Sequence, residues 1–256
     1  MDLSDNNIGN EGASALADAI KQSKSLATAI LDWNYIGDVG VSALAKSIKQ
    51  STLLTTLNAA GNRFGPVGES AIADAIKQST SLASVNLSCN GLGDFSAIVD
   101  AIGLSTSITT VILNSNQIGA NGAAALARAV ACSTSSLTSL DLGRNSIGPV
   151  GAIAIAEAIK QSNSLTSLDV SWNAIGSAGV SAFAEAITAK GTVLVAVDVS
   201  WNAIDVKGMV AIAAAVAQST SLVLSEVDVR NNAVGTTVDA AISKARQLKP
   251  KITIVF

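Results

Sequence analysis

Four aspartates with a regular spacing are the residues of this 256-residue chain whose arrangement most suggests chemistry. Asp141, Asp169, Asp198 and Asp228 follow one another at intervals of 28, 29 and 30 residues. A row of carboxylates could attract a basic group on a partner, because acidic surfaces draw cationic ones. The same row could simply keep an exposed surface hydrated, so both interpretations stay open. A calcium site is not expected, because Ca²⁺ needs six to eight oxygens around the ion.

The three tryptophans share a second repeated position, three residues after the one that the aspartates occupy. Tryptophan is enriched among the residues that dominate binding energy, although neighbouring indoles could also simply stack on each other. Arg144 and Arg230 belong to the same surface and offer partners for carboxylates. The sequence therefore predicts a partner-binding surface made of Trp33, Asp141, Arg144, Asp169, Trp172, Asp198, Trp201, Asp228 and Arg230.

Composition disfavours catalysis and nucleic-acid binding. The chain contains no histidine, which removes the usual general base and metal ligand, and no activated serine is evident. Its net charge is −3 and it has no cluster of lysines or arginines to neutralise phosphates. Cys89 and Cys132 are too few for a metal site and fit a reducing compartment. We therefore expect a cytoplasmic protein that is not an enzyme and has no cofactor and no metal.

A repeated pattern organises the whole chain. The motif Leu-x-x-Leu-x-Leu-x-x-Asn-x-Ile-Gly recurs, and a phrase with helical apolar spacing follows each copy. Each unit is thus predicted to be a short strand, a tight loop and a helix. The recurrent asparagine stands at Asn6, Asn34, Asn62, Asn90, Asn116, Asn145, Asn173, Asn202 and Asn232.

This motif resembles the ribonuclease-inhibitor-like class of leucine-rich repeats, which also occurs in NOD-like receptors. The resemblance implies an α/β solenoid, a curved horseshoe with a parallel sheet on its concave side and helices on its convex side. It covers residues 1–256, as one domain of about nine repeats plus a terminal strand. The bend also follows from spacing, since strands stack about 4.8 Å apart whereas helix axes need roughly 8–10 Å.

Each recurring residue type has a physical reason within a repeat. Paired aliphatics such as Leu140 and Leu142 point into the core, because alternate strand residues face opposite sides. The asparagine side chain can satisfy backbone groups of the loop. The loop glycine, as at Gly9 and Gly37, is expected to serve unusual backbone angles or close approach. Nothing in this scheme requires the aspartates, which we expect to be dispensable for folding.

The two ends of the sequence lie inside repeats and carry no evident polar cap. Solenoids usually cover their terminal layers, so uncapped ends could allow self-association. We expect Ile252 and Ile254 to form a tenth strand with an exposed outer edge, and the same register places Thr253 beside Asp228. The uncharged stretch from Gly208 to Ser225 is not expected to cross a membrane, because the repeat register divides it into a helix, a turn and a strand.

The resulting functional hypothesis is a non-catalytic scaffold that binds a protein partner, one with a basic surface, on its concave face. A second hypothesis is a GTPase-activating protein, because proteins that activate Ran resemble this fold and act through an arginine. That resemblance implies Arg63, in an exposed repeat loop, as the catalytic residue. A third is that these repeats belong to a larger receptor.

Overall fold

The computed structural model describes residues 1–92, 96–132, 135–219 and 223–256. These residues form two compact units. Unit 1 comprises Met1–Gln117 with Thr134–Leu137, and unit 2 comprises Ile118–Ser133 with Thr138–Phe256. The expectation of a single domain over 1–256 stays a prediction.

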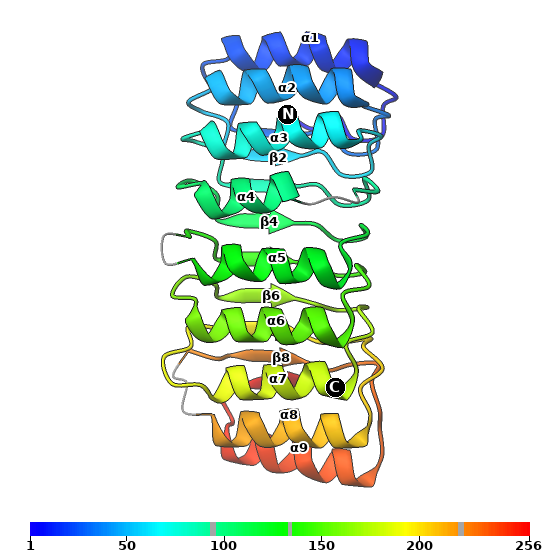
Figure 1. Cartoon of the computed structure of the whole chain (residues 1–256), viewed down its shortest axis with the longest axis vertical. Helices are drawn as coiled ribbons and strands as arrows, with labels where there is room; N and C mark the ends of the chain where they lie inside the picture. Colours follow the sequence, from blue (N-terminus) through cyan, green and yellow to red (C-terminus); the bar gives the residue numbers. More distant parts are fainter. Residues whose placement is uncertain (93–95, 133–134, 220–222) are drawn as a thin grey trace. The chain divides into compact units, whose positions relative to one another are not determined.

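Unit 1 alternates helices with short parallel strands that pair in sequence order. Its helices pack against their neighbours along the chain and lie on one side of its strands (Figure 1). An isolated bridge between Asp2 and Ile30 adds the first repeat to this sheet. The elements are α1 (Gly9–Gln22), β1 (Thr28–Ile30), α2 (Asp38–Gln50), β2 (Thr56–Asn58), α3 (Pro66–Gln78), β3 (Ser84–Asn86), α4 (Ser96–Leu104) and β4 (Thr110–Ile112).

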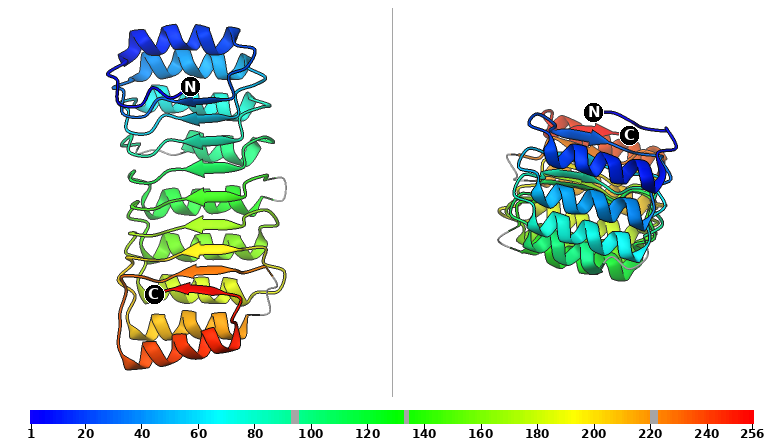
Figure 2. Two further views of the ribbon diagram at one scale, coloured as in Figure 1. Left: turned by 180° about the vertical axis from the view of Figure 1, so that it is seen from behind. Right: turned by 90° about the horizontal axis from the view of Figure 1, so that it is seen from above.

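Unit 2 repeats the same arrangement, again with parallel strands in sequence order. Seen from behind, its strands lie in front of its helices (Figure 2). The alternation confirms the predicted α/β repeat fold class. The elements are α5 (Gly119–Ala131), β5 (Ser139–Asp141), α6 (Gly148–Gln161), β6 (Ser167–Asp169), α7 (Gly176–Thr188), β7 (Ala196–Asp198), α8 (Val206–Gln218), β8 (Glu226–Asp228), α9 (Thr236–Leu248) and β9 (Thr253–Val255).

The core of each unit lies between its strands and its helices. Leu57 and Leu140, at the centres of β2 and β5, are buried, and so are Leu31 and Leu142, which follow one strand in each unit. Alanines and isoleucines of the helices complete these layers, as the alanine-rich composition predicts. Gly40 lets α2 approach α1, because a Cβ there would come within 2.9 Å of the Ala13 Cβ.

The side chains of the recurrent asparagines satisfy backbone groups of the loops, as predicted, and most of them are buried in a ladder that runs from repeat to repeat. The side-chain Oδ1 of Asn173 accepts hydrogen bonds from the backbone N–H groups of Asn145 (2.9 Å) and Ile147 (3.2 Å) in the preceding repeat. Its Nδ2 donates to the carbonyls of Leu142 (2.8 Å) and Val170 (3.1 Å). One amide thus satisfies loop groups of two successive repeats, which ties the repeats together where the strands end.

The loop around each asparagine adopts a backbone that the sequence did not reveal. In most repeats the residues before and after the asparagine both have positive φ, for example 56° at Trp172 and 51° at Ala174. The glycine expectation is confirmed for Gly9, whose φ is 61°. At Gly37, whose φ is an ordinary −97°, the alternative reason, close approach, applies. Gly37 instead donates its N–H to Asn10 Oδ1 at 2.8 Å, and a Cβ would crowd that oxygen.

The last strand of unit 2 forms at the predicted residues but in a different register. β9 pairs with β8, and Val255, not Thr253, lies beside Asp228, so the predicted alignment is wrong. Ile252 and Ile254 are both buried, as expected for inward positions. A shift of two residues preserves this alternation, so the apolar pattern could not distinguish the two registers. This strand was expected to be the tenth but is β9, because the first repeat contributes only the isolated bridge at Asp2 and no strand of its own.

Candidate functional site

Unit 2 brings the four predicted aspartates into one row. Asp141 pairs with Asp169, Asp169 with Asp198, and Asp198 with Asp228, each on the next strand of the sheet. Strand spacing therefore separates the backbones of neighbouring aspartates by about 4.8 Å. The row exists as the sequence analysis predicted.

Each aspartate of the row also supports its own loop, a role that the sequence analysis did not assign to these residues. In every case Oδ1 accepts a hydrogen bond from the backbone N–H two residues later, which closes an Asx turn where the strand ends. The donors are Gly143 (2.8 Å), Ser171 (2.7 Å), Ser200 (2.8 Å) and Arg230 (3.0 Å). Asn58 and Asn86 make the same turn in unit 1. The shared acceptor at these positions was the sequence signal for this role.

The aspartates of the row differ in their pKa shifts and in their salt-bridge partners. Burial raises the pKa of Asp169 and of Asp198 above the ordinary aspartate value, and the neighbouring carboxylates raise it further, although hydrogen bonds from Ser171 and Ser200 oppose this. Arg230 Nη2 lies 2.6 Å from Asp228 Oδ2, and this contact raises the pKa of Arg230. Among the described residues, no salt bridge involves Asp169 or Asp198. Each of these two carboxylates is therefore partly buried and has no salt-bridge partner within the described part of the chain.

A stack of three side chains lies in the neighbouring position of unit 2. The rings of Trp172 and Trp201 are stacked, with centroids 4.0 Å apart and planes 11° from parallel. The guanidinium carbon of Arg144 lies 4.2 Å from the ring centroid of Trp172. The indoles are nonetheless 40% and 45% exposed. Stacking and exposure therefore occur together, and the result is a rigid aromatic surface with a cation at one end.

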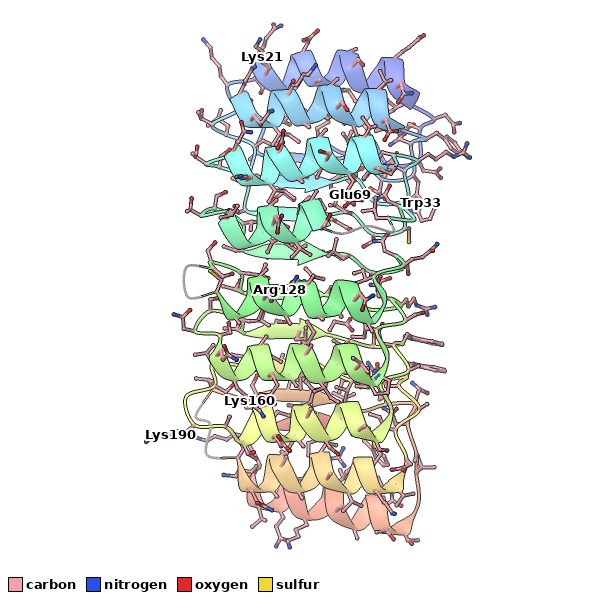
Figure 3. All side chains as sticks on the ribbon, in the orientation of Figure 1. Lys21, Trp33, Glu69, Arg128, Lys160 and Lys190 are labelled. Carbon is pink, nitrogen blue, oxygen red and sulfur yellow. The ribbon has the colours of Figure 1, made fainter. Side chains whose placement is uncertain are left out.

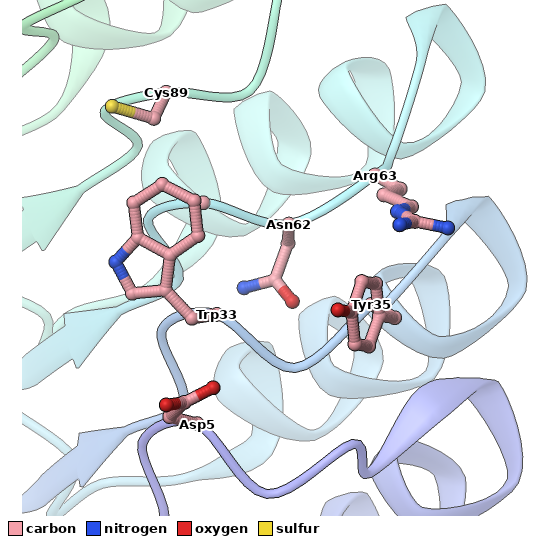
Figure 4. Close-up of a pocket in the computed structure, with 7 residues that line it drawn as sticks. Asp5, Trp33, Tyr35, Asn62, Arg63 and Cys89 are labelled. Atoms are coloured by element: carbon pink, nitrogen blue, oxygen red, sulfur yellow. The ribbon is translucent and has the colours of Figure 1, made fainter.

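Trp33 lies in unit 1, whereas the other predicted residues lie in unit 2. It is 54% exposed and lies among the loops that follow the strands of unit 1 (Figure 3). It borders a hollow of about 660 Å³, drawn in Figure 4. The hollow is lined by Asp5, Trp33, Tyr35, Gly61, Asn62, Arg63 and Cys89.

The set of partner-binding residues predicted from the sequence did not include Tyr35. Tyr35 is 49% exposed, and the guanidinium carbon of Arg63 lies 4.1 Å from its ring centroid. The available signal was that Trp33 and Tyr35 flank the same ladder residue, Asn34, in a loop whose backbone is repeated. Arg63 lies in an exposed loop, as the GTPase-activating hypothesis requires, and that hypothesis stays a prediction.

Metal and membrane sites were searched over the described residues. Within residues 1–92, 96–132, 135–219 and 223–256, no group of three or more histidine, cysteine, aspartate or glutamate side chains is placed to hold a metal ion. Over the same ranges no helix combines the length and apolar character needed to cross a bilayer.

Comparison with known proteins identifies the repeat. A family model described as "Leucine Rich repeat" matches seven segments that together make up more than half of the chain. The chain belongs to the leucine-rich repeat family. The matched segments of this leucine-rich repeat protein are residues 1–17, 30–45, 78–97, 104–127, 134–156, 161–184 and 192–213. No curated protein sequence matches it. The narrower ribonuclease-inhibitor-like subclass stays a prediction.

Solved structures share the fold at low sequence identity. The leucine-rich repeat-containing protein LegL7 from Legionella pneumophila is 16% identical, with a TM-score of 0.61 over 100% of this chain and 89% of that one. Actin-binding site 2 of leiomodin-1 is 17% identical, with a TM-score of 0.42 over 70% of this chain and 89% of that one. The C-terminal domain of Caenorhabditis elegans tropomodulin is 13% identical, with a TM-score of 0.42 over 62% and 81%.

Proposed function

We propose that this leucine-rich repeat protein is a non-catalytic scaffold that binds a protein partner through unit 2. The contact surface comprises the stack of Arg144, Trp172 and Trp201 together with the row of aspartates beside it. The observation that carries the proposal is that both indoles are exposed at a loop position where other repeats hold small residues. Cys89 and Ser115 occupy the equivalent position with the same positive φ, 56° and 57°, so a small side chain suffices there.

The stack has the physical properties of a binding hot spot. Exposed indoles leave apolar area in water, and covering that area on binding is favourable. The two rings support each other at 4.0 Å, so little side-chain freedom remains to be lost when a partner docks. A flat aromatic surface with Arg144 at its end suits a partner that offers an apolar group next to a hydrogen-bond acceptor.

The aspartates favour a partner with a basic surface. Within the described ranges neither Asp169 nor Asp198 forms a salt bridge, whereas Asp228 is paired with Arg230. A basic partner would therefore gain most at the centre of the row. Charge reversal at Asp169 and Asp198 is expected to act mainly on the association rate and on its salt dependence.

Selection from a displayed peptide library tests the proposal without knowledge of the natural partner. Ligands enriched on the wild-type chain are measured again on Trp172→Ala with Trp201→Ala. We expect them to bind the double variant about 30-fold more weakly, which corresponds to about 2 kcal/mol. Val150→Ala removes an exposed apolar side chain from α6 and serves as the matched control, with unchanged binding.

Two outcomes would contradict the proposal. One is that the enriched ligands bind the double variant with full affinity while Val150→Ala weakens them. The other is that a library with basic and aromatic residues at every position enriches nothing over a variant with both tryptophans replaced.

A further inference from the structure

The hollow in unit 1 is bordered by two aromatic side chains held in fixed positions. Trp33 and Tyr35 have φ values of 58° and 56° and flank Asn34, which is fully buried in the asparagine ladder. Asn34 Nδ2 donates to the carbonyls of Leu3 (2.8 Å) and Asp32 (3.1 Å). The backbone beneath both rings is therefore held by the fold, and the rings face the hollow without a rearrangement.

Gly61 fixes the orientation of the Trp33 ring. The indole lies directly on the backbone of Gly61, and a Cβ there would collide with it. Gly61 occupies the position equivalent to Trp33 in the next repeat, so a small residue stands where a side chain would otherwise displace the indole. The backbone of Gly61 thus covers one face of the Trp33 ring, while more than half of the side chain stays exposed to a ligand.

Arg63 provides a positioned cation on the other side of the hollow. Its backbone N–H donates to the Ile36 carbonyl at 2.8 Å, and its guanidinium stacks on Tyr35. Stacking covers one face of the guanidinium and leaves its N–H edges in the plane, where they bind a carboxylate in a two-pronged geometry. Among the described residues, no carboxylate forms a salt bridge with Arg63.

Asp5 places a negative charge at the side of the hollow opposite to Arg63. It lies beside Trp33 and away from Arg63 in Figure 4, and it makes no salt bridge with that arginine. An occupant therefore meets the Arg63 cation at one side, and the Trp33 indole together with the Asp5 carboxylate at the other (Figure 4). A compact anion with two charges suits this field poorly, because Asp5 repels it.

We propose that this hollow binds the carboxyl terminus of a peptide that ends in an aromatic residue. The terminal carboxylate pairs with Arg63, the aromatic ring packs on Trp33, and a backbone N–H of the peptide donates to Asp5. The volume of the hollow, about 660 Å³, falls within the usual range for ligand-binding pockets. This site is separate from the surface proposed in unit 2, and neither proposal depends on the other.

Titration of defined peptides into the full chain tests the site. The probe is a fluorescein-labelled pentapeptide, Gly-Ser-Gly-Ser-Phe, with a free carboxylate, and binding is followed by fluorescence anisotropy. We expect the same peptide with a terminal amide to bind at least tenfold more weakly, since it lacks the charge that pairs with Arg63. Replacing the terminal phenylalanine by alanine is expected to have an effect of similar size.

Variants of the chain complete the test. Arg63→Gln and Trp33→Ala are each expected to weaken binding of the free-acid peptide at least tenfold, and Arg63→Lys less than Arg63→Gln. Arg128→Gln removes an exposed arginine from α5 and is the matched control, with unchanged affinity. A thermal unfolding transition of each variant shows whether that variant is folded. If Arg63→Gln or Trp33→Ala does not fold, the comparison of Arg63→Lys with wild type still tests the role of Arg63.

The proposal is overturned if the amide binds as tightly as the acid, if the free-acid peptide does not bind, or if Arg63→Gln and Arg128→Gln bind equally. Unlabelled phenylalanine that competes as strongly as the unlabelled peptide would also overturn the assignment to a peptide terminus. The double replacement of Trp172 and Trp201 is expected to leave this titration unchanged, so failure here is distinguishable from failure in unit 2.

Discussion

The indoles of Trp172 and Trp201 stack face to face across neighbouring repeats, with ring centroids 4.0 Å apart. Each projects from a backbone of positive φ, at 56° and 55°, directly before a buried ladder asparagine. The spacing of the repeats therefore sets the spacing of the rings. The loop backbone holds both rings at an exposed position.

Replacing both indoles by alanine is expected to leave stability nearly unchanged. The pair contributes about 0.5–1.5 kcal/mol through stacking, and alanine is already accepted at positive φ at Ala174 and Ala203. We expect the melting temperature of Trp172→Ala with Trp201→Ala to fall by no more than a few degrees, as measured by calorimetry. Cooperative unfolding lost in the double variant would show that the rings belong to the core.

Removal of a ladder asparagine is expected to be far more damaging. Asn173→Ala loses the side-chain hydrogen bonds described above and leaves buried backbone groups without partners. At about 1–3 kcal/mol for each such group, we expect a loss of at least about 3 kcal/mol in the free energy of unfolding. Asn6, whose Nδ2 bonds to the Ser4 carbonyl on an exposed loop, is the matched position. Urea denaturation that gave Asn6→Ala and Asn173→Ala equal effects would contradict the role of the ladder.

Asp169→Asn is expected to stabilise the chain at neutral pH. Burial raises the pKa of Asp169 in the folded state, so its ionisation disfavours folding as pH rises through that pKa. Asparagine keeps the Asx turn without the charge, as Asn58 and Asn86 do in unit 1. The advantage over wild type should disappear below the ordinary aspartate pKa of 3.8, where the carboxyl is protonated in both states.

The control for this prediction is Asp169→Ala, which removes the turn together with the charge. Loss of the hydrogen bond to the Ser171 N–H at 2.7 Å should cost about 1 kcal/mol, also at acid pH. Denaturation curves at pH 7 and pH 3.5 separate the two effects. An asparagine variant that is less stable than wild type at pH 7 would contradict the assigned cause.

Asp38→Ala is expected to destabilise unit 1, because Asp38 supports the helix of the repeat that follows its own. Asp38 Oδ1 accepts hydrogen bonds from the N–H groups of Gly65 (2.7 Å) and Gly68 (2.8 Å), at the start of α3. The side chain thus caps the helix of the next repeat, and its loss should cost about 1–2 kcal/mol. Asp74→Ala, on the exposed face of α3, should change the free energy of unfolding little. Similar effects in both variants would rule out the cap.

Side-chain periodicity alone was enough to predict several features. An asparagine at a spacing close to 28 residues, with alternating aliphatics before it and helical apolar spacing after it, predicted the strand, the loop, the helix and the support of the loop backbone by the asparagine. These depend on local chemistry: period two for a strand, period 3.6 for a helix, and an amide that can both donate and accept. Because the repeats are stacked copies, one correct unit implies the others, and the rows of aspartates and tryptophans follow from alignment.

Only the tertiary structure decided how the side chains of neighbouring repeats are used. It showed that Asp141 and its equivalents close turns, that Asp228 is paired with Arg230 while Asp169 is not, and that Trp33 lies in a hollow with Tyr35 and Arg63. It also placed Val255 beside Asp228. These contacts depend on backbone angles in the loops and on registers that differ by two residues. A repeat pattern is the same for either choice, so distances in three dimensions had to resolve them.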